Sequence, residues 1–101
     1  MVDIINELKI AEKTGELILG SRETVKAVMQ GKGKLIIIAS NCPERIKKTL
    51  THYAQLSSIP IHICSLTSKE IGEACGKRFM VASLLVLNEG ESEILKLVSK
   101  E

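Results

Sequence analysis

The sequence predicts an α/β protein in which a largely parallel sheet lies between two layers of helices. Helical and extended patterns alternate along the chain, which is the order typical of α/β proteins. Residues 35–39 are continuously apolar, with three consecutive isoleucines, as expected of a strand covered by helices on both faces. The length of 101 residues suits one hydrophobic core. We therefore expect residues 1–101 to form a single domain with a central strand at 35–39.

The first third of the chain is expected to form two helices separated by a short strand. Apolar residues recur at helical spacing over 4–14, with Asp3 as a plausible N-cap before them. Residues 17–19 are apolar and fit a short buried strand. A second helix is expected to begin with Ser21 as its cap and to end at the two glycines within 31–33.

The remainder of the chain continues the alternation. The longest helix is expected over 43–56, where a proline fits the first turn and apolar residues keep the 3.6 period. A third strand is expected at 61–64, and residues 67–70 have the spacing of a capping box that opens a short helix. The last strand is expected at 82–87 and a final helix at 92–98.

Composition narrows the class of protein. The chain is 45% hydrophobic and 26% charged, close to ordinary globular values, and its formal charge is +2. No stretch is long and apolar enough for a membrane helix, and the start of the chain does not have the pattern of a signal peptide, so we expect a soluble, cytoplasmic protein. Cys42, Cys64 and Cys75 are odd in number and widely spaced, and we interpret them as reduced structural thiols. Only 2% of residues are aromatic, so an exposed aromatic side chain would be conspicuous.

The predicted topology brings three segments toward one edge of the sheet. Right-handed crossovers place the ends of the first two strands there, together with the starts of the helices at Ser21 and Pro43. Helix N-termini offer unpaired N–H groups and a positive dipole end to an anion such as phosphate. If the last strand runs antiparallel to the others, residues 76–80 reach the same edge. The segments 20–26, 40–43 and 77–80 then form one candidate surface for a phosphate-bearing partner.

Each of these segments also has a purely structural interpretation. Arg22 and Lys26 lie four residues apart and fit a solvated helix face on which Glu23 compensates their charge. Asn41 fits a cap of the third helix, although its amide can also pair with the edge of a base. Phe79 fits a core position, although it follows two cations directly, and bases commonly stack on exposed aromatics.

Several of these residues match a known family. The segment 15–20, Gly-Glu-Leu-Ile-Leu-Gly, and the chain as a whole resemble the thirty-e family of archaeal and eukaryotic large-subunit ribosomal proteins. In the wider superfamily that binds kink-turn RNA, the second helix opens with Gly-x-Asn-Glu-x-x-Lys. Gly20, Glu23 and Lys26 occupy the matching positions, while Arg22 replaces the asparagine. Because arginine lacks the acceptor of asparagine, the base contact made by that asparagine is not carried over to Arg22.

Two further motifs carry the resemblance. The family's Asn-x-Pro element after the second strand matches Asn41-Cys42-Pro43, and its stacking aromatic before the fourth strand matches Phe79. Some relatives have arginine directly after that aromatic, where this chain has Met80. The stacking contact is therefore expected here without the cationic contact that follows it in those relatives.

The resemblance implies a fold and a function. The fold is a three-layer α/β/α sandwich with a four-stranded mixed sheet, in the order 1-4-2-3 with strand 4 antiparallel. The function is binding of a sharply bent RNA internal loop, with tandem sheared G·A pairs and a looped-out nucleotide, as a structural constituent of the large ribosomal subunit. The expected partners are kink-turn ribosomal RNA and that subunit, with the protein monomeric away from the ribosome. The RNA-binding residues are expected to be Gly20, Ser21, Arg22, Glu23, Lys26, Asn41, Lys77, Arg78, Phe79, Met80 and Val81.

Two other classes of function remain open at this stage. Cys42 at a helix N-terminus would be an enzyme-like nucleophile if its pKa were depressed, and the final helix would be a docking site for a protein if its apolar face were unpartnered. We favour neither class. His52, His62 and Cys64 do not have the spacing of a metal site, and no phosphate-binding glycine loop follows a strand. We expect no catalysis, no metal, no cofactor, no small-molecule substrate and no membrane association. A kink-turn RNA-binding protein outside the ribosome is a further alternative.

Overall fold

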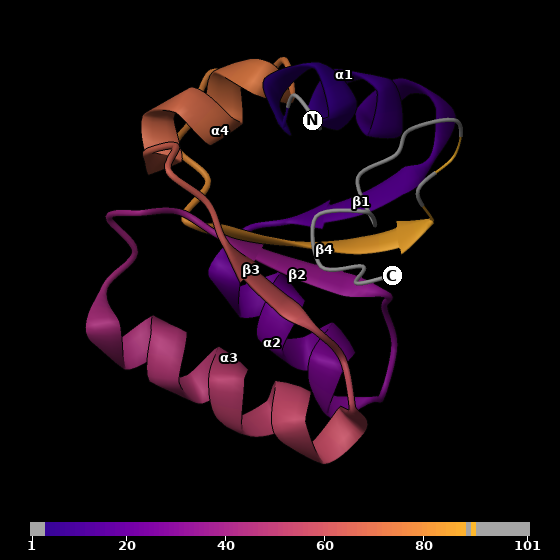
Figure 1. The fold of residues 1–101 in the computed structure, drawn as a ribbon, viewed down its shortest axis with the longest axis vertical. Coiled ribbons are helices and arrows are strands. Elements are labelled where there is room, and N and C mark those ends of the chain that lie inside the picture. Colours follow the sequence, from indigo (N-terminus) through magenta and orange to yellow (C-terminus); the bar gives the residue numbers. More distant parts are fainter. Residues whose placement is uncertain (1–3, 89, 91–101) are drawn as a thin grey trace.

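The structure is a computed structural model that describes residues 4–88 and residue 90. The described residues alternate between helices and strands in the predicted order (Figure 1). The elements are α1 (Ile4–Thr14), β1 (Glu16–Leu19), α2 (Ser21–Met29), β2 (Leu35–Ile38), α3 (Glu44–Ser57), β3 (Ile61–Ile63), α4 (Ser68–Ala74) and β4 (Ser83–Asn88). The N-cap expected at Asp3 and the final helix expected over 92–98 lie outside the described residues.

The four strands form one mixed sheet with the order β1-β4-β2-β3. β4 runs antiparallel to β1 and β2, and β3 runs parallel to β2. On β2, Ile37 lies between Leu84 of β4 and His62 of β3. Helices α1 and α4 cover one face of the sheet and α2 and α3 cover the other (Figure 1). The strand order and the antiparallel direction of β4, which the family resemblance implied, are confirmed.

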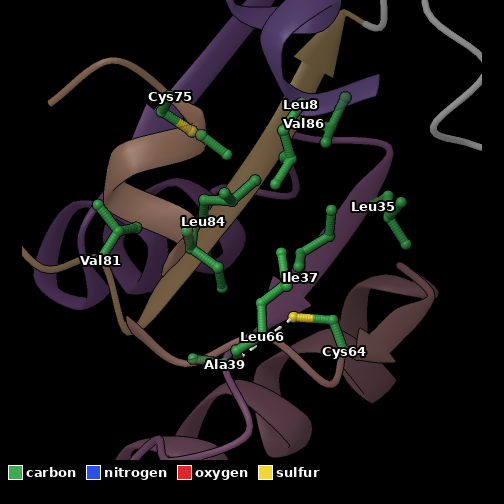
Figure 2. Close-up of a cluster of buried hydrophobic side chains, with 12 residues drawn as sticks. Leu8, Leu35, Ile37, Ala39, Cys64, Leu66, Cys75, Val81, Leu84 and Val86 are labelled. Carbon is green, nitrogen blue, oxygen red and sulfur yellow. Dashed lines mark hydrogen bonds between the residues drawn. The ribbon is translucent and has the colours of Figure 1, made fainter. Parts of the chain in front are cut away.

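Alternate residues of the central strands build two separate cores. Leu35 and Ile37 point into the cluster beneath α1 and α4, which Figure 2 shows. Ile36 and Ile38 point into the cluster between the sheet and α2 and α3. Leu84 and Leu85 of β4 divide in the same way between the two clusters. Because successive strand residues face opposite sides, an uninterrupted apolar run is what a strand between two helical layers requires.

Helix ends differ from the sequence-based expectation in two places. Ser21 does not cap α2: the N-cap is Gly20, whose φ of 100° lies in the region that favours glycine. Pro43 is the N-cap of α3 and does not belong to its first turn. The capping box that opens α4 is confirmed, since Thr67 and Glu70 exchange both of its hydrogen bonds.

Candidate functional site

The candidate surface lies at one edge of the sheet. Because β1 and β2 run antiparallel to β4, the ends of β1 and β2 meet the beginning of β4 there (Figure 1). The segments 20–26 and 40–43 follow β1 and β2, and the segment 77–80 precedes β4. The structure therefore brings together three loops that are far apart in the sequence.

Hydrogen bonds tie the first of these loops to the start of β4. The Gly20 N–H donates to the Ser83 carbonyl oxygen at 3.0 Å, and the hydroxyls of Ser21 and Ser83 lie 2.9 Å apart. On the other side of β4, the Ala39 N–H donates to the Ala82 carbonyl at 2.8 Å. Ser83 is fully buried, so its hydroxyl has found a partner within the protein, as buried polar groups usually do. Ser21 thus holds the loop in place and does not cap the helix.

Asn41 is exposed, and its side chain holds the start of α4. Its Oδ1 accepts a hydrogen bond of 2.9 Å from the N–H of Ser68, the first residue of α4. The alternative that Asn41 caps α3 is therefore wrong, because its side chain reaches α4 instead. A backbone N–H needs an acceptor, which fixes the orientation of the amide. Within residues 4–88 and 90, no partner for the Asn41 Nδ2 group is found, so two N–H donors remain for a ligand.

Phe79 and Met80 form the apolar part of the surface. Their side chains are 58% and 70% exposed, so the alternative that Phe79 belongs to the core is wrong. The next residue, Val81, is fully buried and packs in the cluster beneath α1 and α4 (Figure 2). The expectation that Val81 lies on the surface is not met, because the chain turns inward there to enter β4.

Close backbone packing against α4 fixes the position of Phe79. The Lys77 N–H donates to the Gly72 carbonyl at 2.8 Å, and the Val81 N–H donates to the Ser68 carbonyl at 3.0 Å. Between these two bonds, a Cβ atom on Gly72 would overlap the carbonyl oxygen of Phe79. Glycine is required at this position of α4 because the loop backbone lies directly against the helix. Phe79 is therefore an exposed ring on a backbone held at both ends.

Cationic side chains flank the surface on two sides. Lys77 lies 3.8 Å from Glu12 of α1, whereas Arg22, Lys26 and Arg78 are exposed and form no ion pair with any described residue. Glu23 does not pair with Arg22 or Lys26, so the compensation considered above is absent for these described residues.

Arg22 and Lys26 also line a groove of about 530 Å³ between α2 and α3. Arg45, in the first turn of α3, lines the same groove. Arg45 is not among the RNA-binding residues expected from the sequence. Its place two residues after Pro43, the last residue of the Asn-x-Pro element, was the available indication.

Burial raises the pKa of all three thiols. Burial raises the pKa of Cys42, with Lys47 opposing the shift and Glu44 adding to it. The depressed pKa that an enzyme-like Cys42 required is therefore contradicted. Burial raises the pKa of Cys75 to about 11, and all three cysteines are free, in agreement with their interpretation as reduced thiols. Across the described part of the chain, no group of three or more potential metal ligands occurs, and none of the helices there could span a membrane.

The chain is similar over nearly its whole length to known ribosomal proteins. The model of the "Ribosomal protein L7Ae/L30e/S12e/Gadd45 family" matches residues 3–96. Large ribosomal subunit protein eL30 of Methanocaldococcus jannaschii is 45% identical over 100 residues, which cover 99% of this chain and 91% of that protein. The eL30 protein of Methanothermobacter thermautotrophicus is 44% identical, with 96% and 99% covered. A solved structure of a Bacillus halodurans protein of unknown function superimposes with a TM-score of 0.81 at 26% identity, covering 95% of each chain.

Proposed function

The chain belongs to the ribosomal protein L7Ae/L30e/S12e/Gadd45 family, and on this premise we propose that it is a structural constituent of the large ribosomal subunit that binds kink-turn ribosomal RNA. Its place of action is the ribosome in the cytoplasm. Residues 1–101 act as a single RNA-binding domain, and the protein performs no chemistry. Near full-length similarity to proteins named large ribosomal subunit protein eL30 supports this proposal.

The exposure of Phe79 is the observation that carries the assignment. The chain has one Phe, one Tyr and no Trp, and its only Phe presents a largely exposed ring beside the cations Lys77 and Arg78. A largely exposed aromatic ring contributes little to the stability of the folded protein. A splayed RNA base, in contrast, gains stacking energy on such a ring.

The other residues of the edge have complementary roles. Gly20 permits close approach of the backbone to the RNA, and Arg22 and Lys26 bind phosphates or the edge of a guanine. Asn41 reads a base through the two N–H donors of Nδ2, so it selects acceptor atoms on that base, since its oxygen is already bound to Ser68. Further members of the surface are Ser21, Glu23, Lys77, Arg78 and Met80. Val81 contributes by anchoring the segment 77–80 in the core cluster beneath α1 and α4.

The same residues argue for binding and against catalysis. Cys42, the one candidate nucleophile, has a raised pKa, and thiols at such sites are mostly protonated and slow to react at neutral pH. The donors and cations of the edge instead match the groups that hold a bent RNA without altering it.

Competitive binding to two RNAs tests the proposal. The protein should bind a kink-turn RNA more tightly than a fully paired duplex of the same length, with affinity that falls as salt rises. Shape recognition is refuted by equal affinity for the two RNAs. Sedimentation of a native lysate then separates the two family roles: a ribosomal protein should be found with large subunits, whereas a kink-turn protein outside the ribosome should sediment apart from them.

A further inference from the structure

The groove between α2 and α3 carries more positive charge than the proposed contacts at the edge account for. Arg22 and Lys26 line it from α2 and Arg45 lines it from α3, and no carboxylate lines it. The hollow beside Phe79 differs, since a carboxylate, that of Glu73, lines it together with the cations Lys69, Lys77 and Arg78. The groove is therefore suited to an anion.

The charge of this groove reflects the whole α2 and α3 layer. These two helices contain five Lys or Arg residues and two Glu residues, whereas α1 and α4 contain three Lys and four Glu. Within the described chain, Arg22, Lys26 and Arg45 form no ion pair, while Lys47 on the same helix as Arg45 lies 3.8 Å from Glu44. Unpaired cations on facing helices repel one another, and binding of an anionic partner reduces this electrostatic repulsion.

The lining of the groove also includes two apolar side chains. Val25 and Ile46 line it, and both are half-buried against the core cluster beneath α2 and α3. The hydroxyl-bearing residues Ser21 and Thr49 complete the lining. A lining that combines cations with apolar side chains matches a ribose-phosphate strand, because the phosphates meet the cations while the sugar rings contact the apolar side chains.

The groove is continuous with the edge, since Ser21, Arg22 and Lys26 belong to both. We propose that the RNA strand adjoining the bases held at the edge continues into the α2–α3 groove, where Arg45 binds a phosphodiester outside the kinked loop. This inference rests on the proposed function and adds a backbone contact on α3 to it. It assigns Arg45 a part in affinity and none in base choice.

Replacement of Arg45 by glutamine tests the inference. The Thr49 hydroxyl donates to the Arg45 carbonyl, a backbone group that glutamine retains, so Arg45→Gln should keep the melting temperature of the natural protein. Its affinity for kink-turn RNA should fall about tenfold at low salt, and the slope of log affinity against log salt should become shallower by about one. The matched control is Lys13→Gln at the end of α1, on the opposite face of the sheet, which should change neither quantity.

Uncharged substitutions in the RNA backbone locate the phosphate that Arg45 contacts. At one methylphosphonate position outside the kinked loop, the natural protein should lose about tenfold in affinity while Arg45→Gln loses nothing further. If Arg45→Gln has the affinity and the salt slope of the wild-type protein, the groove contact is overturned while the kink-turn function stays intact. A natural protein that does not distinguish kink-turn RNA from duplex removes both proposals.

Discussion

The centre of the sheet and its loop edge use the same residue types for different purposes. Every residue of β2 is fully buried, as are Leu84 and Leu85 of β4. At the edge, Met80 is 70% exposed and the adjoining Val81 is 0% exposed. Apolar side chains one position apart thus lie on opposite sides of the boundary between core and surface. We therefore expect side-chain truncation at the centre to lower stability and truncation at the edge to lower RNA affinity. The two quantities can be measured separately.

The largest effect is expected at the centre. Ile37→Ala should lower the free energy of unfolding by about 2–5 kcal/mol, because it leaves a cavity in the cluster of Figure 2. Chemical denaturation measures this loss. The fraction that remains folded should bind kink-turn RNA normally. A specific loss of RNA affinity in folded Ile37→Ala would break the contrast between centre and edge.

Phe79→Ala should show the opposite behaviour. Affinity for RNA should fall by roughly 1–3 kcal/mol through loss of base stacking, while the free energy of unfolding stays within about 0.5 kcal/mol, as for other surface changes. Titration calorimetry and thermal denaturation measure the two quantities separately. A destabilised Phe79→Ala protein whose folded fraction binds RNA normally would remove Phe79 from the site.

Salt provides the control for that experiment. Stacking releases no counterion, so Phe79→Ala should keep the natural slope of affinity against salt, whereas Lys26→Ala should make the slope shallower. Identical slopes in the wild-type protein, Phe79→Ala and Lys26→Ala would argue against a phosphate contact at Lys26.

Replacement of Asn41 should affect both stability and RNA affinity, because its amide has both a structural and a binding role. Asn41→Ala should cost about 1–3 kcal/mol of RNA affinity and about 1 kcal/mol of stability, since the Ser68 N–H loses its acceptor. Asn41→Asp keeps an acceptor oxygen and removes the donors. It should therefore keep the stability and still lose affinity, measured in the same way. Full RNA affinity in Asn41→Asp would show that the Nδ2 donors are not used.

The smallest effect is expected at Cys42. Because burial raises its pKa, alkylation of Cys42 by iodoacetamide at pH 7 should be slower than that of a free cysteine. The rate should rise as pH passes above the usual thiol range, because only the thiolate reacts. Rapid modification of Cys42 at low pH would reopen the enzyme-like interpretation of the edge.

The apolar pattern predicted most of the fold, for a local reason. The run at 35–39 and the 3.6-residue period of α3 depend only on which side chains face a core, and both elements lie close to their predicted places. The strand order β1-β4-β2-β3 followed from resemblance alone, because periodicity carries no information on which strands are neighbours or which direction β4 takes.

Roles that depend on a distant partner were beyond the sequence. Ser21 was expected to cap α2 and instead meets Ser83, 62 residues away. For Asn41, a cap of α3 was one of two alternatives, and its side-chain oxygen in fact binds Ser68, 27 residues away. The sequence shows which side chains can form hydrogen bonds. The packing of the folded chain decides which partner lies within hydrogen-bonding distance.

The sequence by itself therefore determined the alternation of elements, the composition of the core and the set of polar and aromatic residues available at the loops. Tertiary structure decided that Phe79 is exposed while Val81 is buried, and that Arg45 joins Arg22 and Lys26 along one groove. The physical reason is that exposure and charge clustering are properties of surfaces assembled from several segments, and a surface exists only after the segments have packed.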